Sequence, residues 1–162
     1  MQADGLQMLD SRRGMSSQPY VHEARLRVRY AETDQMGVAY HANHLIWMEI
    51  GRVEYCRSIG IRYKDMEENG ILLAVVEVQC RYRHPARYDE EIAVRTRVEA
   101  IGSRGMQFGY EIVIAATNQP VAEGYSKHVF CDRALNPVRL PDQYRRVFRG
   151  GQGIEQQHTQ VG

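Results

Sequence analysis

Apolar and charged residues alternate along a stretch near the start of the chain, residues 21–30. Its apolar positions recur at every second residue: Ala24, Leu26, Val28 and Tyr30. The positions between them are charged: Glu23, Arg25, Arg27 and Arg29. Because successive side chains of a strand point to opposite faces, this pattern predicts a β-strand with one face buried and the other in solvent.

Residues 44–59 show a different pattern. Apolar side chains occupy most positions of a helical wheel, and few residues are polar. Asn43 is a favourable N-cap and Gly60 a favourable C-terminal stop, so the segment is predicted to form a helix of about four turns. Since the apolar residues surround the wheel, we expect this helix to be buried around most of its circumference.

Four further strand-like segments follow without a second long helix between them: residues 72–83, 91–100, 106–116 and 121–132. Turn signals rich in Pro, Gly and Asn separate these segments. In the first of them the predicted inward face holds five residues: Ala74, Val76, Val78, Cys80 and Tyr82. A short helix is predicted over residues 141–148.

One strand, one long helix and a four-strand meander is an α+β order, which excludes the alternating βαβ units of a nucleotide-binding sheet. The predicted fold is a curved antiparallel β-sheet wrapped around the central helix. A single sheet leaves edges and a face that the chain has no elements to cover. We therefore expect a homo-oligomer, a homotetramer or at least a homodimer.

The folded domain is expected over residues 20–149, because residues 1–19 and 150–162 are polar and aperiodic, which predicts disordered tails. The longest apolar run, residues 71–76, is too short to span a membrane, and the first 19 residues lack the apolar core of a secretory signal. We therefore expect a cytoplasmic protein with no membrane span. The three cysteines are widely spaced and are expected as reduced, mostly buried thiols: Cys56, Cys80 and Cys131.

The charge balance excludes some functions. With 21 basic and 20 acidic side chains the formal net charge is +1, whereas a general nucleic-acid binder carries a clear basic excess. The sequence contains no glycine-rich phosphate loop, dinucleotide fingerprint, nucleophile elbow or paired cysteine motif. We therefore expect no nucleic-acid partner and no bound cofactor. Arginine outnumbers lysine 19 to 2, so the chain has many guanidinium groups that can bind phosphate.

The densest group of polar side chains lies between the first strand and the long helix, in residues 30–44, Tyr-Ala-Glu-Thr-Asp-Gln-Met-Gly-Val-Ala-Tyr-His-Ala-Asn-His. The free backbone N–H groups of a helix N-terminus can polarise a carbonyl oxygen. Asp34 is the candidate base or nucleophile beside them, and Gly37 would let a ligand approach the backbone. The alternative is that Thr33 and Asp34 only shape and cap a turn.

Two other interpretations of this segment are weaker. Asp34, His41 and His44 would offer a metal ion only three ligands, so no metal site is expected. Glu49, about one turn inside the helix, is a second candidate catalytic carboxylate. Pairing of Glu49 with Arg52 is the ordinary expectation at this spacing.

Two segments resemble a known family. The first is Tyr-Ala-Glu-Thr-Asp-Gln-Met-Gly-Val-Ala-Tyr-His-Ala-Asn-His of residues 30–44, followed by Glu-Ile-Gly-Arg in the helix; the second is Cys-Arg-Tyr-Arg-His-Pro-Ala-Arg-Tyr-Asp of residues 80–89. Together they resemble the hotdog-fold acyl-CoA thioesterases, most of all the group containing 4-hydroxybenzoyl-CoA thioesterase and the Tol-Pal-associated thioesterases. The resemblance extends over about residues 21–141, and its Thr-Asp-x-x-Gly-x-x-x-His core is fairly specific for the family.

The resemblance implies roles for individual residues. Asp34 matches the family's catalytic aspartate. His41 matches the position at the start of the helix where a backbone N–H polarises the thioester carbonyl, and the His41 side chain and Tyr30 match further active-site positions. The implied substrate-binding positions near them are Gly37, Val38 and His44. Basic side chains near the surface hold coenzyme A in such folds, which here indicates Arg81, Arg83 and Arg87.

The expected function is hydrolysis of an acyl-CoA to the free acid and coenzyme A, with Asp34 attacking the thioester or activating a water molecule. Acyl-carrier-protein thioesters are an alternative substrate. Two rival functions stay open, acyl-CoA binding without turnover and protein association alone. Five residues are candidates for an acyl pocket, although each type is more often simply core: Tyr40, Trp47, Met48, Tyr55 and Met66.

Overall fold

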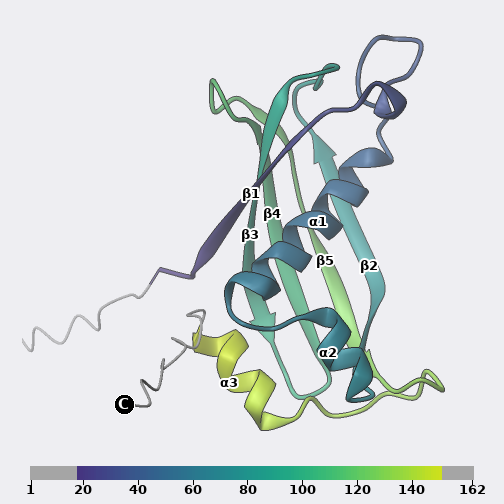
Figure 1. Cartoon of the computed structure of the whole chain (residues 1–162), viewed down its shortest axis with the longest axis vertical. Coiled ribbons are helices and arrows are strands. Elements are labelled where there is room, and N and C mark those ends of the chain that lie inside the picture. Colours follow the sequence, from purple (N-terminus) through teal and green to yellow (C-terminus); the bar gives the residue numbers. More distant parts are fainter. Residues whose placement is uncertain (1–17, 151–162) are drawn as a thin grey trace, which may run out of the picture.

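The computed structural model describes residues 18–150, and the predicted tails over residues 1–19 and 150–162 lie outside this range except for residues 18, 19 and 150. Five strands form one antiparallel sheet with α1 lying across one face, as the α+β order predicts (Figure 1). The strands are β1 Val21–Arg27, β2 Leu72–Tyr82, β3 Glu91–Ile101, β4 Gly105–Ile114 and β5 Pro120–Cys131. The helices are α1 Asn43–Ser58, α2 Tyr63–Glu68 and α3 Asp142–Gly150, with a 3₁₀ turn at Tyr30–Glu32.

The strand order is β1-β3-β4-β5-β2, so the predicted four-strand meander is wrong. Only β3, β4 and β5 pair in sequence order, whereas β2 pairs with β5 at one edge of the sheet and β1 with β3 at the other. Residues 83–90 carry the chain from one side of the sheet to the other. Alternation along each strand predicts that it is a strand but does not specify its partner.

The long helix is buried along one stripe rather than around most of its circumference. The buried residues recur at helical spacing: His44, Trp47, Met48, Gly51, Tyr55 and Cys56. Leu45, Ile46 and Ile50 lie on the other side and are 36%, 46% and 38% exposed. The predicted all-round burial is therefore not found within the protomer, because the sheet covers only one side of α1.

Gly51 lets α1 pack directly on β3. A Cβ atom at this position would lie 2.6 Å from both Thr96 Oγ1 and Val94 Cγ1, which is closer than non-bonded atoms approach. The core between helix and sheet is completed by large buried side chains, among them Trp47, Tyr55, Met66, Phe108 and Tyr110. Of the five candidate acyl-pocket residues, Trp47, Met48, Tyr55 and Met66 are core, and only Tyr40 is exposed.

Because of a β-bulge in β2, the residues of that strand that face α1 differ in part from the predicted ones. The register with β5 shifts between Val75 and Glu77, so the strand changes parity at Val76. Val75 is paired with the buried His128, and Val78 with the buried Ser126. Val78, Cys80 and Tyr82 therefore face α1 as predicted, whereas Ala74 and Val76 do not.

Several element boundaries also differ from the predicted ones. β1 ends at Arg27, and Tyr30 lies beyond it and is 78% exposed rather than inward-facing. Asn43 is the first residue of α1 and not its cap, because its side chain donates to the backbone carbonyl of Glu32 at 2.8 Å. Gly60 ends the helix as predicted, with φ +85°. The six residues of α2 were too few to produce a periodic signal.

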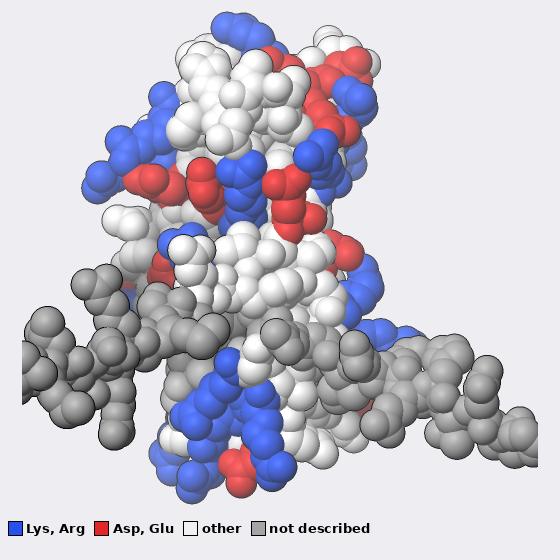
Figure 2. Space-filling view, turned by 90° about the vertical axis from the view of Figure 1, so that its left-hand side faces the viewer, with Lys and Arg blue, Asp and Glu red and all other residues white. Residues whose placement is uncertain are grey.

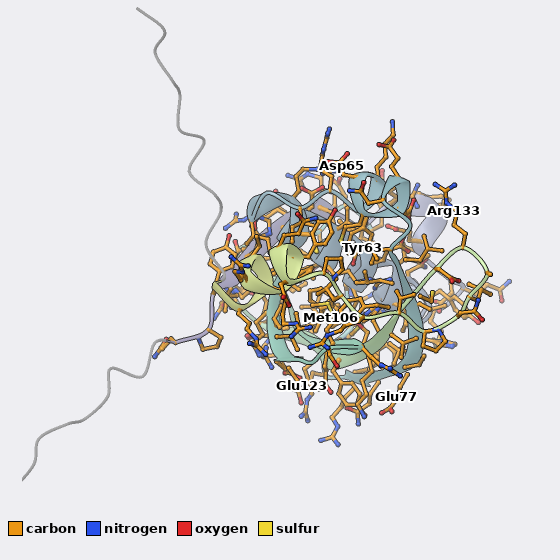
Figure 3. All side chains as sticks on the ribbon, turned by 90° about the horizontal axis from the view of Figure 1, so that it is seen from below. Tyr63, Asp65, Glu77, Met106, Glu123 and Arg133 are labelled. Carbon is orange, nitrogen blue, oxygen red and sulfur yellow. The ribbon has the colours of Figure 1, made fainter. Side chains whose placement is uncertain are left out.

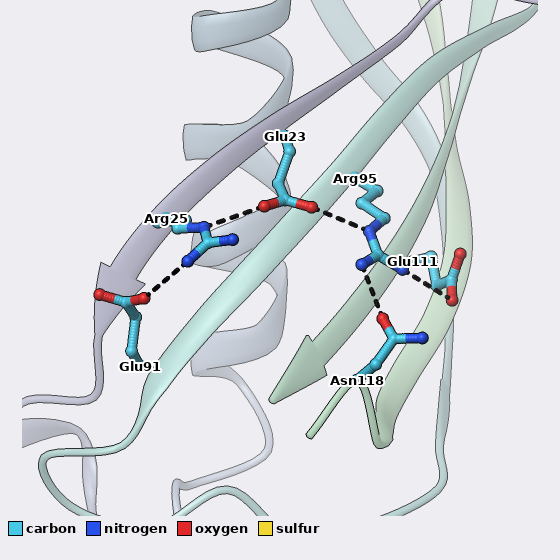
Figure 4. Close-up of polar contacts among 6 residues, drawn as sticks. All are labelled: Glu23, Arg25, Glu91, Arg95, Glu111 and Asn118. Carbon is cyan, nitrogen blue, oxygen red and sulfur yellow. Dashed lines mark hydrogen bonds and ion pairs between the residues drawn. The ribbon is translucent and has the colours of Figure 1, made fainter. Parts of the chain in front are cut away.

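The outer face of β1, β3 and β4 carries a network of charged side chains (Figure 4). Glu23 contacts Arg25 at 2.9 Å and Arg95 at 3.0 Å, and these arginines reach Glu91 at 3.1 Å and Glu111 at 3.7 Å respectively. Basic and acidic side chains are also interspersed over the upper half of the side shown in Figure 2. Exposed pairs of this kind contribute little stability, but they keep this face of the sheet polar.

All three cysteines are free thiols, with Cys56 and Cys131 buried and Cys80 half-buried, as expected from their spacing. Within residues 18–150 no helix is long and apolar enough to cross a membrane.

Candidate active site

The polar segment between β1 and α1 forms a tight loop beside the N-terminus of α1. The Asp34 N–H donates to the Val38 carbonyl at 3.0 Å, and the Gly37 N–H donates to the Asp34 carbonyl at 2.9 Å. Gly37 has φ +75°, a conformation that favours glycine. The Ala39 N–H donates to the Ala86 carbonyl at 2.8 Å, which ties the loop to the segment after β2. The backbone of the loop is thus held from both sides.

The Asp34 carboxylate is half-buried and has one oxygen engaged. Its Oδ1 accepts the Met36 N–H at 2.9 Å, so the turn-capping role considered from the sequence is present. Within the described residues its Oδ2 has no hydrogen-bond partner. The side chain is therefore oriented by the turn and still has an oxygen available for chemistry.

Glu32 anchors this loop through buried hydrogen bonds, a role that the sequence analysis did not predict. The residue is 4% exposed, and its carboxylate accepts the Arg29 N–H at 2.7 Å and the Trp47 indole N–H at 3.2 Å. Its backbone carbonyl accepts hydrogen bonds from the Tyr40 N–H and the Asn43 side chain, both at 2.8 Å. The sequence does not show this role, because two of the partners, Asn43 and Trp47, lie in the next helix.

The N-terminus of α1 presents free backbone donors. The Asn43 N–H donates to the Tyr40 carbonyl and the Leu45 N–H to the Ala42 carbonyl. The N–H groups of His41 and Ala42 donate to no acceptor within residues 18–150. Such groups lie at the positive end of the helix dipole, where they can stabilise a developing oxyanion.

The two histidines of the loop have different environments. His41 is exposed, and its ring lies against Tyr40 with centroids 4.3 Å apart. His44 is buried, and its Nδ1–H donates to the His41 carbonyl at 3.1 Å. Burial lowers the pKa of His44, so this ring is neutral near pH 7. His44 supports the helix start, whereas His41 is accessible to a ligand.

Tyr82, at the end of β2, was predicted only as an inward-facing strand residue. Its hydroxyl donates to the His41 carbonyl at 2.8 Å, and its ring packs edge-on against His44 with centroids 4.8 Å apart. Tyr30 is not part of this group within the protomer, because its exposed ring packs against Tyr88. The structure therefore brings Asp34, His41 and His44 to one end of α1 and leaves Tyr30 on the outer surface.

The three candidate arginines lie in two places. Arg87 donates to the Gly37 carbonyl at 3.4 Å and so lies at the Asp34 loop. Arg83 pairs with Glu123 on β5, and Arg81 is the register partner of that same glutamate. Figure 3 shows Glu123 extending from the sheet on the side opposite the helices. Only Arg87 therefore lies near the loop within one protomer.

Glu49 is exposed on α1, and the expected ion pair between Glu49 and Arg52 does not form within the described residues. Among residues 18–150 no three His, Cys, Asp or Glu side chains are placed to hold a metal ion.

An antiparallel sheet with one long helix against its face and a polar loop at the helix N-terminus defines a hotdog-fold protein. The chain belongs to the Thioesterase-like superfamily, whose family model matches residues 28–148. The resemblance noted in the sequence is thereby confirmed.

Individual relatives agree with this assignment. The chain is 37% identical over 130 residues to YneP of Bacillus subtilis, a candidate acyl-CoA thioesterase, covering 80% of this chain and 91% of that protein. It is 30% identical to the acyl-acyl carrier protein thioesterase ATL3 of Arabidopsis thaliana, and the match covers 84% of this chain and 70% of that protein. The structure of DHNA-CoA thioesterase from Staphylococcus aureus superposes with a TM-score of 0.74 at 30% identity, covering 81% of this chain and 87% of that one.

Proposed function

We propose that this protein hydrolyses acyl-CoA thioesters, with Asp34 as the catalytic carboxylate and the N-terminus of α1 as the oxyanion site. The observation that carries the proposal is the position, in one tightly bonded loop, of a carboxylate oxygen and of two N–H groups, at His41 and Ala42, that have no hydrogen-bond partner among residues 18–150. Membership of the superfamily and the names of the relatives support the reaction class.

The chemistry follows from these groups. Asp34 either removes a proton from a water molecule that attacks the thioester carbonyl, or attacks that carbonyl itself to form an anhydride that water then hydrolyses. In both routes the carbonyl oxygen becomes an oxyanion, which the free N–H groups stabilise. The carbon–sulfur bond breaks, and the thiolate of coenzyme A leaves and takes up a proton. Acyl-carrier-protein thioesters would react by the same steps.

The test is replacement of Asp34 with asparagine, which keeps the shape and the acceptor for the Met36 N–H but removes the charge. We expect kcat on the best acyl-CoA to fall at least ~100-fold while the melting temperature changes little. A turn-capping role would give the opposite result, a loss of about 1 kcal/mol in stability with little change in rate. Retention of more than about a tenth of wild-type kcat would contradict the catalytic assignment.

We propose that Arg87 contacts the nucleotide of coenzyme A, since Arg87 lies at the Asp34 loop. Arg81 and Arg83 would reach that nucleotide only from the far face of the sheet or in a neighbouring copy. Arg87→Ala should raise KM for an acyl-CoA more than for a truncated thioester without the nucleotide. An equal effect on both substrates would show that Arg87 does not contact the nucleotide.

We further propose that the protein is a homodimer or homotetramer. β2 is an edge strand of 11 residues. On its inward side Val75, Val78 and Tyr82 are 50%, 41% and 46% exposed, next to the uncovered apolar side of α1. Unpaired strand edges and apolar surface of this kind are normally covered in solution. Light scattering that gave a mass near 18.7 kDa would contradict this proposal.

A further inference from the structure

Two exposed tyrosines pack against each other at the end of the molecule where α1 begins. Tyr30 follows β1, and Tyr88 lies in residues 83–90, which lead from β2 to β3; both segments are at the top of Figure 1. The two rings are 78% and 58% exposed, their centroids are 5.6 Å apart, and their planes meet at 88°. Neither tyrosine belongs to α1 or β2, the elements whose apolar surface a second copy is proposed to cover. The pair is therefore aromatic surface outside that proposed contact.

The backbone on both sides of the pair is fixed by hydrogen bonds. The Asp89 N–H donates to the Val28 carbonyl at 2.9 Å, and Asp89 has φ +66°, so Tyr88 lies in a turn tied to the end of β1. The Tyr30 carbonyl accepts the Thr33 N–H at 3.1 Å and the Thr33 hydroxyl at 2.7 Å. A ligand that stacks on rings held in this way loses little free energy to the ordering of loops.

Each tyrosine of the pair directly follows an exposed arginine. Arg29 precedes Tyr30, and its side chain is 71% exposed. Arg87 precedes Tyr88, and its guanidinium donates to the Gly37 carbonyl of the catalytic loop at 3.4 Å. Guanidinium groups bind phosphate through paired N–H donors. Aromatic rings and groups that can bind phosphate therefore occur together at this site.

The carboxylates around these arginines leave Arg87 available. The Glu90 carboxylate accepts the Arg87 backbone N–H at 2.7 Å, and the buried Glu32 lies 3.4 Å from the Arg29 guanidinium. Asp89 is exposed, and within residues 18–150 neither Asp89 nor Arg87 forms an ion pair. An anionic ligand can therefore bind the guanidinium of Arg87 beside the aromatic pair.

Coenzyme A has the chemistry that fits this combination. Its pantetheine arm carries the thioester at one end, and phosphates and an adenine base at the other. A flat base stacks favourably on an aromatic ring, and in the corner between Tyr30 and Tyr88 a base that stacks on one ring presents its edge to the other. The phosphopantetheine arm of a carrier protein carries the same thioester but no base, so it leaves the pair unused.

We propose that Tyr30 and Tyr88 bind the adenine base of coenzyme A, so that this protein distinguishes acyl-CoA from acyl-carrier-protein substrates. The inference rests on the proposed thioester hydrolysis and specifies the carrier of the acyl group. Arg87 contacts the Gly37 carbonyl, and the Gly37 N–H donates to the Asp34 carbonyl at 2.9 Å, so a phosphate at Arg87 and a thioester at Asp34 are held by one loop. Tyr30 takes a binding role here in place of the active-site role that the resemblance implies.

Binding of two probes tests the proposal without any hydrolysis. Calorimetry compares free coenzyme A with 4′-phosphopantetheine, which lacks the nucleotide. Wild-type protein should bind coenzyme A at least ~10-fold more tightly, and Tyr88→Leu should remove most of that difference, because leucine has no ring on which a base can stack. Tyr88→Phe should retain the difference. Equal affinity of the wild-type protein for the two probes, or an unchanged difference in Tyr88→Leu, would overturn the proposal whether or not the protein hydrolyses thioesters.

The same comparison in catalysis shows whether the two carriers are distinguished as substrates. With one acyl group, the ratio of kcat/KM for acyl-CoA to that for acyl-phosphopantetheine should be at least ~10 in the wild-type protein. Tyr88→Leu and Tyr30→Leu should each lower this ratio by several-fold, mainly through a higher KM for acyl-CoA. Tyr125→Leu, on β5, is the matched control and should keep the wild-type ratio. An equal loss on both substrates in Tyr30→Leu would return that residue to an active-site role and overturn the paired site.

A second copy is the other candidate occupant of the pair, and light scattering on Tyr88→Leu separates this case. The wild-type mass is expected, because the tyrosines lie outside the proposed contact between copies. A lower mass together with an unchanged substrate ratio would show that a neighbouring copy covers the pair, and would overturn the proposal.

Discussion

The Tyr82 hydroxyl donates a hydrogen bond of 2.8 Å to the backbone carbonyl of His41 and so connects the end of edge strand β2 to the start of α1. The His44 Nδ1–H donates to the same carbonyl. With its carbonyl held twice, the peptide group at His41 is oriented, and the position of the nearby free N–H groups is set by β2 as well as by the helix.

Tyr82→Phe should therefore lower activity more than stability. We expect kcat/KM on an acyl-CoA to fall by roughly tenfold, while the free energy of unfolding falls by about 1 kcal/mol, the usual net value of one hydrogen bond. Tyr125→Phe is the control, because the Tyr125 hydroxyl donates to Glu77 and not to a residue of the Asp34 loop. Equal losses of activity in the two variants would argue against the proposed role of Tyr82.

Glu32→Gln should destabilise the protein and disorganise the Asp34 loop. The carboxylate accepts three hydrogen bonds: one oxygen accepts the Arg29 backbone N–H, and the other accepts the Trp47 indole N–H and, at 3.4 Å, the Arg29 guanidinium. Glutamine has one acceptor oxygen, so one donor is left unsatisfied at a cost of about 1–3 kcal/mol in chemical denaturation. Glu111→Gln removes a half-exposed carboxylate whose one ion pair within the described residues, with Arg95, is 3.7 Å long, and it should change stability by less than about 0.5 kcal/mol. Similar effects of both changes would contradict the anchoring role.

Gly51→Ala should destabilise the protein, although alanine favours helices over glycine by about 1 kcal/mol. The new Cβ atom would meet Val94 and Thr96 at 2.6 Å in a filled core, and such overpacking costs about 1–3 kcal/mol. Val94→Ala in the same chain should recover part of this loss, which a double-mutant cycle of unfolding free energies measures. A more stable Gly51→Ala protein would show that α1 shifts without cost.

Stability should fall as the pH is lowered from 6.5 to about 4, in part because of His128. Its pKa is about 4 in the folded protein, against 6.5 for an ordinary histidine, so over this window the unfolded chain binds a proton that the folded chain does not. The contribution is fully present above pH 6.5 and is lost as the pH falls, by an amount on the order of 3 kcal/mol. Burial lowers the pKa of His44 too, which acts in the same direction. His128→Asn should have a shallower slope of unfolding free energy against pH, and an unchanged slope would refute the assignment.

Much of the architecture is present in local patterns. Alternation over residues 21–30 predicts β1, which ends at Arg27, and the apolar spacing from residue 44 predicts α1 with its end at Gly60. The resemblance of residues 30–44 to a known motif placed Asp34 and His41 beside the helix start, where the structure has them. These features depend on residues that are close together in the sequence, so the sequence pattern is enough to predict them.

The sequence by itself thus determined that this chain forms an α+β hotdog domain with a polar loop at the N-terminus of its long helix. Only the tertiary structure decided that β2 pairs with β5, that Glu32 and Tyr82 hold the loop, and that the rings of Tyr30 and Tyr88 pack together. Each of these contacts joins residues from separate elements, and periodicity records which face a side chain occupies but not which residue it meets there.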